Sequence, residues 1–294
     1  MGEIHKDGWQ ILKKENFECF EIKNFEEENL KKKLIDVDGI ILRTANLQSK
    51  VLKYCTNLKI ITRHGVGYDN VDLEFLNKNK IALAITSTSN AVSVAEHVLT
   101  SFLYLTKNIH LSDKLTREGK FNDKSSLPNF FELFKKNVVI FGFGRIGKEV
   151  AKRCKGFDSN IYIVDPFVKS DEIEKYGYKV SDKIEGIKLA DYISLHLPLN
   201  NKTINFINEK YLEKALKEKK IRGAALDVFK IEPPDKDHPI FKLSNVLLSP
   251  HNAALTLECR KRMAIEAAEN TIYFLNKDKK LNSGNIVNKL EIRI

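Results

Sequence analysis

Residues 138–165 constrain the fold of this chain more than any other segment. The apolar run Val138–Phe141 leads into a G-x-G-x-x-G pattern at residues 142–147, and a helix-compatible stretch follows. A second run of β-branched residues then ends at Asp165. A strand, a glycine-rich turn, a helix and a strand in this order make up the βαβ unit that binds a dinucleotide. The order of the four elements disfavours the alternative, an ordinary glycine-rich turn.

The three glycines have different physical roles in such a unit. Gly142 permits the tight turn, Gly144 lets the backbone approach a pyrophosphate, and Gly147 lets the helix pack on the strand. The N-terminus of the helix then offers its free N–H groups to the phosphates. Asp165 lies 18 residues after Gly147, near the spacing of an acid that binds a ribose 2′-hydroxyl. Because an acid also repels a 2′-phosphate, the sequence favours NAD over NADP as the cofactor.

Length and composition indicate a cytoplasmic protein with two domains. A chain of 294 residues is long enough for two cores, and no apolar run approaches transmembrane length. Residues 1–7 lack an apolar stretch of the signal-peptide type. The four cysteines occur singly, which predicts reduced thiols and neither disulfides nor a metal site.

The formal net charge of +10 does not by itself predict a nucleic-acid partner. The lysines lie in mixed clusters such as residues 213–220, where glutamates accompany them as on a solvated helix face. The excess charge is more consistent with a positive field that favours anionic substrates. We therefore expect neither a nucleic acid nor a membrane as a partner.

Helix-like and strand-like stretches alternate along the chain, which is typical of an α/β fold with parallel sheets. The predicted strands are Gly39–Leu42, Lys59–Thr62, Ala82–Ile85, Val138–Phe141, Ile161–Val164, Tyr192–Leu197, Gly223–Val228 and Val246–Leu248. Long amphipathic helices are expected at 91–117 and 256–274. The pattern predicts two Rossmann-like or flavodoxin-like domains that flank a cleft. Residues 1–90 plus 256–294 would form a substrate domain, and residues 91–255 an NAD-binding domain.

Polar residues follow three of the predicted strands, where an open parallel sheet binds its ligands. His251, directly after a strand and a proline, is a candidate general base, and Glu232 is a carboxylate that could orient it. The remaining histidines are interpreted as structural: His5, His64, His97, His110, His196 and His238.

These motifs resemble the NAD-dependent D-isomer-specific 2-hydroxyacid dehydrogenases, and most closely the D-3-phosphoglycerate dehydrogenase branch, which acts in serine biosynthesis. The similarity extends over almost the full chain. It rests on Arg43 and on the segments 63–72, 93–97, 142–147, 191–198, 223–234 and 249–254.

The resemblance implies hydride transfer between NAD and a small anionic D-2-hydroxy acid, or the matching 2-oxo acid. His251 would be the acid/base and Glu232 its carboxylate partner. The residues implied to line the NAD site are Val66, Gly142, Gly144, Arg145, Ile146, Gly147, Asp165, Leu197, Asp227, Asn252, Ala253 and Ala254. Arg43 and the backbone of Val66 and Gly67 would face the substrate.

The chain departs from the family pattern after residue 212. In the family, the helix matching Asn208–Leu212 is followed by a strand and by a loop whose arginine grips the substrate carboxylate. Here Leu212 continues directly into residues 213–216, so that strand, loop and arginine are absent. Arg222 is no substitute, because it precedes the next strand and lies at the opposite end of that strand from Asp227.

A second departure lies at the N-terminus, where the family's first strand is missing or reduced to Gly2–His5.

The internal gap after residue 212 leaves several interpretations open. The sheet could close by pairing Tyr192–Leu197 with Gly223–Val228, because backbone groups that are buried unpaired are costly. Otherwise the sequence is an incomplete gene model, a spliced or deleted form, or one from which residues were left out. Loss of a mobile segment is the weakest of these, because interior strands are rarely disordered.

Two functions follow from these observations. The favoured one is an enzyme that acts on 3-phosphoglycerate-like substrates. Its turnover is severely impaired if the chain is complete, and Arg43 or Arg63 would compensate in part for the lost arginine. The alternative is a non-catalytic NAD-binding sensor or interaction protein, which would not need His251 and Glu232.

The resemblance also implies a homodimer. The stretch Val92–Ile109 is apolar on more than one side, which exceeds the single stripe needed to dock a helix on its own domain. A symmetry-related copy is the commonest way to cover such a surplus. The alternative is a helix that is buried inside its own chain, between the two domains.

Overall fold

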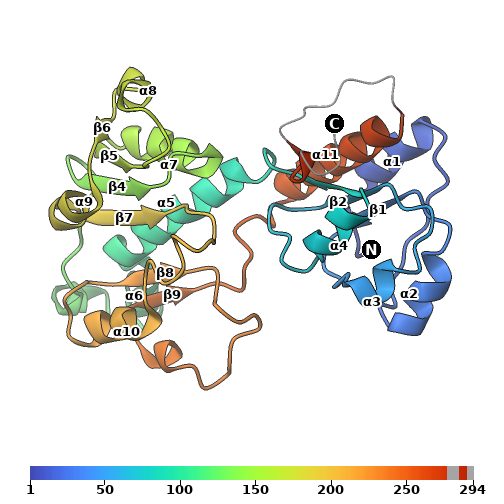
Figure 1. The fold of residues 1–294 in the computed structure, drawn as a ribbon. Coiled ribbons are helices and arrows are strands. Elements are labelled where there is room, and N and C mark those ends of the chain that lie inside the picture. Colours follow the sequence, from blue (N-terminus) through green and yellow to red (C-terminus); the bar gives the residue numbers. More distant parts are fainter. Residues whose placement is uncertain (277–284, 290–294) are drawn as a thin grey trace. The chain divides into compact units, whose positions relative to one another are not determined.

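The computed structural model describes residues 1–276 and 285–289 and contains two compact units (Figure 1). The first unit comprises Met1–Asn90 and Leu255–Ile294, and the second comprises Ala91–Ala254. Each unit contains parallel strands and helices, so the predicted α/β class is confirmed. No helix among the described residues is long and apolar enough to cross a membrane.

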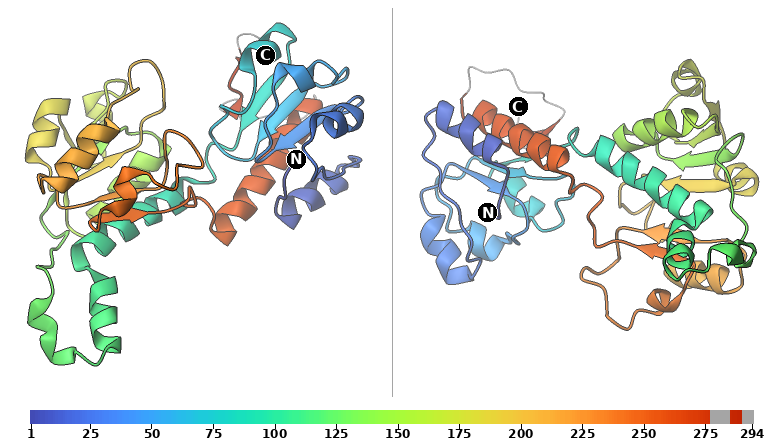
Figure 2. Two further views of the ribbon diagram at one scale, coloured as in Figure 1. Left: turned by 90° about the horizontal axis from the view of Figure 1, so that it is seen from below. Right: turned by 180° about the vertical axis from the view of Figure 1, so that it is seen from behind.

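The first unit is built on a parallel sheet in the order β1-β2-β3. Its strands are β1 (Gly39–Leu42), β2 (Ile60–Arg63) and β3 (Ala82–Ile85). Its helices are α1 (Lys6–Lys14), α2 (Glu27–Lys33), α3 (Ser49–Leu52), α4 (Leu73–Lys78) and α11 (Leu257–Leu275). Helix α11 lies beside α1 and also contacts all three strands (Figure 2).

The two-residue period of these strands distributes their side chains between two cores. Ile61 and Leu83 pack in the cluster that contains residues of α2, α3 and α4. The alternate residues Ile60 and Ala82 pack in a cluster with Leu275 of α11. Both faces of this sheet are therefore buried, which explains why its strands are continuous apolar runs.

The N-terminal residues 1–5 form no strand. The backbone of Met1 nevertheless lies beside β1, where its amino group donates to Ile41 O at 2.7 Å and its carbonyl accepts from Arg43 N at 2.9 Å. Of the two expectations for the first strand, missing or reduced to Gly2–His5, the structure agrees with the first, and Met1 makes the backbone contact with β1.

The second unit contains a four-stranded parallel sheet and a separate two-stranded parallel sheet. The larger sheet has the order β6-β5-β4-β7, with β4 (Asn137–Phe141), β5 (Asn160–Val164), β6 (Lys179–Val180) and β7 (Tyr192–Leu195). The smaller sheet pairs β8 (Ala224–Leu226) with β9 (Val246–Leu248). The helical elements are α5 (Ala91–Lys107), α6 (Ile109–Arg117), η1 (Phe121–Ser126), α7 (Arg145–Lys155), α8 (Ser170–Lys175), α9 (Lys183–Leu189), α10 (Glu209–Lys217) and η2 (Pro239–Lys242).

The gap in the predicted sheet does not close. Strand β7 pairs only with β4, and β8 pairs only with β9, among the residues that the structure describes. Among the interpretations left open for the gap, the pairing of Tyr192–Leu197 with Gly223–Val228 does not occur in the described residues. Gly223, directly before β8, is closely packed, since a Cβ there would lie 2.8 Å from Asn245 O and 3.3 Å from a side-chain carbon of Leu105 of α5. Strand β7 pairs on one side alone among the described strands and is therefore an edge strand of its sheet.

The predicted helix 91–117 is two helices. Asn108 adopts a left-handed conformation, with φ 44° and ψ 42°, and separates α5 from α6. Asparagine tolerates this conformation better than most residues, because its side chain can hydrogen-bond locally. Helix α5 contacts α7 as well as β8 and β9. Within its own unit the apolar surplus of α5 is covered only in part, because Leu99 is buried, Val98 and Phe102 are half-buried, and Val92 is 36% exposed.

Three of the four cysteines are buried and one is half-buried, and all are free thiols. Burial raises the pKa of Cys154 to about 12, so this thiol is uncharged and inert at neutral pH.

His64 is buried in the first unit, with only 7% of its surface exposed. Burial lowers its pKa from 6.5 to about 4, and the positive charges of Arg43 and Arg63 act in the same direction. The folded state therefore holds this imidazole neutral at a pH where the unfolded chain already binds a proton. Stability from this group is fully present above pH 6.5 and is lost as the pH falls toward 4.

We expect the free energy of unfolding to fall by about 2 kcal/mol between pH 7 and pH 5 on account of His64. Urea unfolding at the two pH values measures this loss. His64→Asn should remove most of the pH dependence, whereas His110→Asn, a change at an exposed histidine, should leave it unchanged. An equal pH dependence in the wild type and in His64→Asn would contradict the expectation.

Candidate active site

The glycine-rich turn connects β4 to α7, and two of its glycines are required by the packing of the protein itself. Gly142 has φ +95°, and a Cβ at this position would lie 2.4 Å from His196 O. A Cβ on Gly147 would lie 2.0 Å from Gly142 O. Around Gly144, by contrast, a Cβ would meet no atom within 4 Å. The space beside Gly144 is therefore open for a ligand.

The first turn of α7 offers donors to an anion in that space. Gly144 is the N-cap residue and supplies no side-chain cap. Arg145 is exposed and Ile146 is half-buried at the start of the helix. An uncapped N-terminus with free N–H groups suits a pyrophosphate.

Asp165 is fixed beside the same turn at the end of β5. Its Oδ2 accepts a hydrogen bond from Phe143 N at 2.7 Å, and its Oδ1 accepts one from Phe167 N at 2.9 Å. An ionised carboxylate has about four lone-pair positions, so Asp165 can still accept a ribose hydroxyl. Leu197, after β7, also lies at the turn, since one of its methyl carbons would be 3.4 Å from a Cβ on Gly142.

Asp227, after β8, binds the backbone of the segment that carries His251. Its Oδ1 accepts from Asn252 N at 2.9 Å and its Oδ2 accepts from Ala253 N at 3.1 Å. Ala253 is buried, and Ala254 follows it as the last residue of the unit. The strand ends of β8 and β9 therefore meet, as expected for parallel neighbours.

Glu232 and His251 form a hydrogen-bonded pair. Nδ1 of His251 lies 2.7 Å from Oε2 of Glu232, and Oε1 of Glu232 accepts from Phe229 N at 3.0 Å. Burial opposes ionisation of Glu232, but the hydrogen bonds from His251 and Phe229 N outweigh it and lower the pKa of this carboxyl. Because the carboxylate accepts at Nδ1–H, the neutral imidazole has its lone pair on Nε2. The His251 side chain is 61% exposed, so Nε2 is accessible to a substrate.

The predicted substrate-facing residues Val66 and Gly67 lie in the first unit, in the loop after β2. Val66 is 39% exposed. Arg63 holds this loop, because its Nε donates to Gly67 O at 2.8 Å and its Nη1 donates to Leu42 O at 2.7 Å. Arg43 donates through Nη1 to Glu3 O at 3.0 Å. Both arginines are therefore bound to backbone carbonyls of their own unit.

The segment between α10 and β8 contains only residues 218–223. Its one arginine, Arg222, lies over the ring of Phe131, with 3.7 Å between the guanidinium carbon and the ring centre. Its guanidinium group therefore contacts the Phe131 ring, and Arg222 precedes β8 whereas Asp227 follows it.

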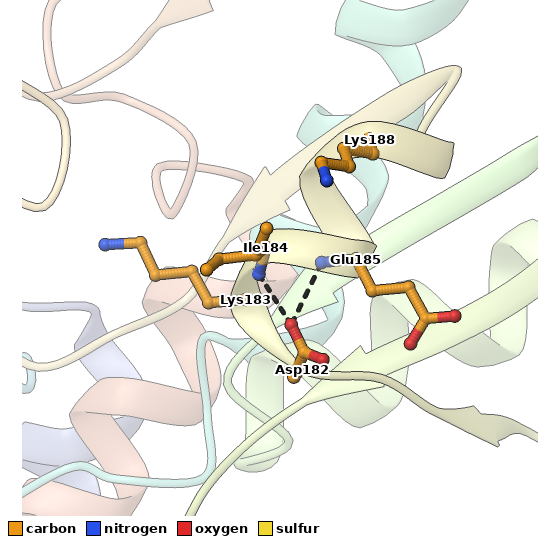
Figure 3. Close-up of a pocket in the computed structure, with 5 residues that line it drawn as sticks. All are labelled: Asp182, Lys183, Ile184, Glu185 and Lys188. Atoms are coloured by element: carbon orange, nitrogen blue, oxygen red, sulfur yellow. Dashed lines mark hydrogen bonds between the residues drawn. The ribbon is translucent and has the colours of Figure 1, made fainter.

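A hollow on the second unit lies at residues other than those of the site described above. It is lined by Asp182, Lys183, Ile184, Glu185 and Lys188 (Figure 3). Asp182 caps α9 there, since its Oδ1 accepts from Ile184 N at 2.8 Å and from Glu185 N at 2.9 Å. No predicted site residue lines this hollow. Within the described residues, no group of three His, Cys, Asp or Glu side chains is placed to hold a metal.

Sequence reasoning missed one part of the site. His97 of α5 was interpreted as structural, yet its Nε2 lies 3.1 Å from Ser249 Oγ, which donates to Asp227 at 2.6 Å. The motifs at 93–97 and 249–254 contained both residues, but 152 positions separate them. Nothing in the sequence shows that the two segments meet.

Comparison with known proteins gives a consistent result. The sequence model of the family described as D-isomer specific 2-hydroxyacid dehydrogenase, catalytic domain, matches residues 1–285. A D-3-phosphoglycerate dehydrogenase of Archaeoglobus fulgidus is 31% identical over 293 residues, which cover 92% of this chain and 55% of that protein. The chain thus spans about half the length of this relative.

Two further relatives are matched over most of their length. A glyoxylate reductase of Pyrococcus furiosus is 31% identical over 306 residues, which cover 92% of this chain and 90% of that protein. The crystal structure of an NAD-dependent formate dehydrogenase from Staphylococcus aureus in complex with NAD is 27% identical, with a TM-score of 0.81. The match covers 96% of this chain and 92% of that structure.

The different surroundings of Gly144 and Gly147 predict different effects of an added methyl group. Gly147→Ala should clash with Gly142 O and lower the free energy of unfolding by about 3 kcal/mol. Gly144→Ala should leave the melting temperature nearly unchanged, because its methyl group enters open space, and should weaken NAD binding by about tenfold (~1.4 kcal/mol). Thermal unfolding and calorimetric titration with NAD measure the two effects. Wild-type NAD affinity in Gly144→Ala would contradict the assignment of the space beside Gly144 to the cofactor.

Proposed function

The chain belongs to the family of D-isomer-specific 2-hydroxyacid dehydrogenases, and we propose that it transfers a hydride between NAD and a D-2-hydroxy acid. Members of this family are NAD-dependent oxidoreductases that act on the CH–OH group of 2-hydroxy acids. The observation that carries the proposal for this chain is the 2.7 Å pair of His251 and Glu232, in the same unit as the glycine-rich turn.

The reaction follows from the hydrogen bonds of that pair. Bound NAD supplies the hydride acceptor. His251 takes the proton of the substrate hydroxyl at Nε2, because its Nδ1–H is already donated to Glu232. Glu232 remains ionised, since its pKa is lowered, and it stabilises the imidazolium that forms. Phe229 N holds the second carboxylate oxygen, so the carboxylate keeps its orientation while the proton moves.

The residues proposed to hold NAD are those that the family resemblance implies: Val66, Gly142, Gly144, Arg145, Ile146, Gly147, Asp165, Leu197, Asp227, Asn252, Ala253 and Ala254. The open space beside Gly144 and the uncapped start of α7 support the pyrophosphate contact. The carboxylate of Asp165 beside the turn supports NAD in preference to NADP.

The substrate we propose is a small anionic acid similar to 3-phosphoglycerate, which would place the protein in serine biosynthesis. Arg43, Val66 and Gly67 would contact it. The relative named D-3-phosphoglycerate dehydrogenase supports this choice, and the relative named glyoxylate reductase supports a smaller 2-oxo acid. The formal net charge of +10 favours an anion in either case. The free cysteines suit a reducing compartment, so a cytoplasmic location is part of the proposal.

The missing arginine segment sets the expected rate. A substrate carboxylate near His251 has no arginine from the stretch between α10 and β8, because Arg222 lies on Phe131. Loss of one electrostatic contact to the reacting group costs about 10²–10³ in rate. Arg43 and Arg63 already bind backbone carbonyls, so their compensation is at most partial.

We expect NADH formation with 3-phosphoglycerate at a kcat about 10²–10³-fold below the ~10 s⁻¹ that is typical of enzymes. The assay is absorbance at a wavelength specific for NADH, with hydroxypyruvate and glyoxylate tested in the reverse direction and the chain length verified by intact mass. A kcat near 10 s⁻¹ (roughly the median for enzymes) would refute the impairment.

His251→Ala should abolish the remaining turnover and leave NAD binding intact, while His110→Ala, a change at an exposed histidine of the same unit, should affect neither. The alternative function, a non-catalytic NAD-binding sensor or interaction protein, predicts NAD binding in every variant and no substrate-dependent absorbance change in any of them.

We also propose a homodimer, supported by the partly exposed apolar residues of α5 and by the exposed ones of α6 and η1. No residue of α6 or η1 is buried within the unit. Ile109 is 61% exposed and Phe121 is 67% exposed. A second copy that packs on these elements would cover apolar side chains that the chain itself leaves in water.

Light scattering at micromolar concentration should give about twice the chain mass of 33.7 kDa. Ile109→Asp combined with Phe121→Asp should give the monomer mass, because each carboxylate would be buried unpaired in the interface. Phe167→Asp, at a phenylalanine that is 81% exposed elsewhere in the unit, is the matched control and should remain dimeric. A monomer mass for the wild type would exclude the dimer.

A further inference from the structure

Three side chains meet beneath the segment that carries His251. Ser249 Oγ lies 2.6 Å from Oδ1 of Asp227, and Nε2 of His97 lies 3.1 Å from the same hydroxyl oxygen. His97 Nε2 is 4.0 Å from Asp227 Oδ1. The three residues come from α5, from the end of β8 and from the end of β9, so they connect a helix to both strands of the smaller sheet.

The direction of each hydrogen bond follows from the chemistry of the groups. An ionised carboxylate only accepts, so Ser249 must give its single hydroxyl proton to Asp227. The hydroxyl oxygen then has only lone pairs left for His97. His97 must therefore carry its proton on Nε2 and donate it to Ser249. The order of donors runs from His97 through Ser249 to Asp227.

Asp227, the last acceptor in this series of hydrogen bonds, also binds the backbone of the segment that carries His251. Asp227 accepts the N–H groups of Asn252 and Ala253, the two residues that follow His251. His251 itself has φ +52°, a left-handed conformation that a non-glycine residue keeps only when its surroundings enforce it. The side chains of His97 and Asp227 are 28% and 17% exposed, so these hydrogen bonds are partly shielded from water.

We propose that His97 and Ser249 are positioning residues for the general base. His97 holds the Ser249 hydroxyl in the orientation in which it donates its proton to Asp227. Asp227 then fixes the backbone around His251. This keeps Nδ1 of His251 on Glu232 and its Nε2 lone pair toward the substrate. The kinetic part of the inference depends on the proposed dehydrogenase activity, and the structural part does not.

The two histidines differ in tautomer, and this difference is observable. His251 carries its proton on Nδ1, because Glu232 accepts there at 2.7 Å, whereas His97 carries its proton on Nε2. Long-range ¹H–¹⁵N NMR spectra of histidine-labelled protein distinguish the two tautomers directly at neutral pH. They do so without substrate, cofactor or turnover.

The test compares variants that remove one hydrogen-bonding group with matched variants that keep it. Ser249→Ala removes the hydroxyl, and Ser249→Thr keeps one. His97→Leu removes the donor, and His97→Gln keeps an N–H group at the place of Nε2. Asp227 is left unchanged, since it also belongs to the proposed cofactor site.

We expect Ser249→Ala and His97→Leu to convert the single Nδ1–H tautomer of His251 into a mixture. Both should lower kcat by about tenfold with little change in KM, because neither residue contacts the substrate and a misplaced catalytic group costs rate. Ser249→Thr and His97→Gln should retain the tautomer and stay within about threefold of the wild-type kcat.

An unchanged His251 tautomer in both Ser249→Ala and His97→Leu would overturn the inference, whatever the activity. A lower melting temperature with an unchanged tautomer would show that the two residues only stabilise the fold, and would also overturn it. If one variant fails to fold, the other decides. If the wild type turns over no 2-hydroxy acid, the proposed function fails, and the tautomer measurement still decides the structural part.

Discussion

Helix α5 holds the two sheets of the second unit together, and the arrangement of the site depends on it. The helix contacts α7, which follows the glycine-rich turn, and it also contacts β8 and β9. The larger sheet ends at β7 and is not hydrogen-bonded to the smaller one among the described residues. The contacts of α5 with α7, β8 and β9 therefore connect the two sheets, which no strand pairing joins in the described chain. The same helix carries His97, which binds the segment of His251 through Ser249.

The interruption of the sheet also leaves apolar side chains and backbone groups of β7 exposed to water. Ile193 and Leu195 of β7 are 40% and 41% exposed, although strands of a parallel sheet are normally covered on both faces. The outer edge of β7 has backbone groups that pair with no strand of the described chain, and such groups are tolerable only where water reaches them. The hydrogen bonds of the site after β8 and β9 run between side chains and backbone, so they do not need a continuous ladder of strands.

The parts that sequence reasoning predicted are those governed by local rules. The turn at 142–147 follows from glycines whose Cβ atoms would clash with backbone oxygens, and the strands follow from short apolar runs between polar segments. The pair of Glu232 and His251 was identified because both follow strands of one parallel sheet. The errors concern what local rules do not fix. Asn108 breaks a periodic helix through one backbone conformation, and β6 has only two residues, too few to show a period.

His97 shows why the remaining part of the site could not be predicted. A histidine on an amphipathic helix is normally a satisfied structural group, and its sequence neighbours give no reason to think otherwise. Its role depends on the hydroxyl proton of Ser249. Because this proton is donated in a hydrogen bond to the Asp227 carboxylate, the Ser249 oxygen can only accept a hydrogen bond from the imidazole of His97. This argument needs the distances among three residues on three elements. A sequence gives the type of each donor and acceptor, but only the folded arrangement decides which of them share a proton.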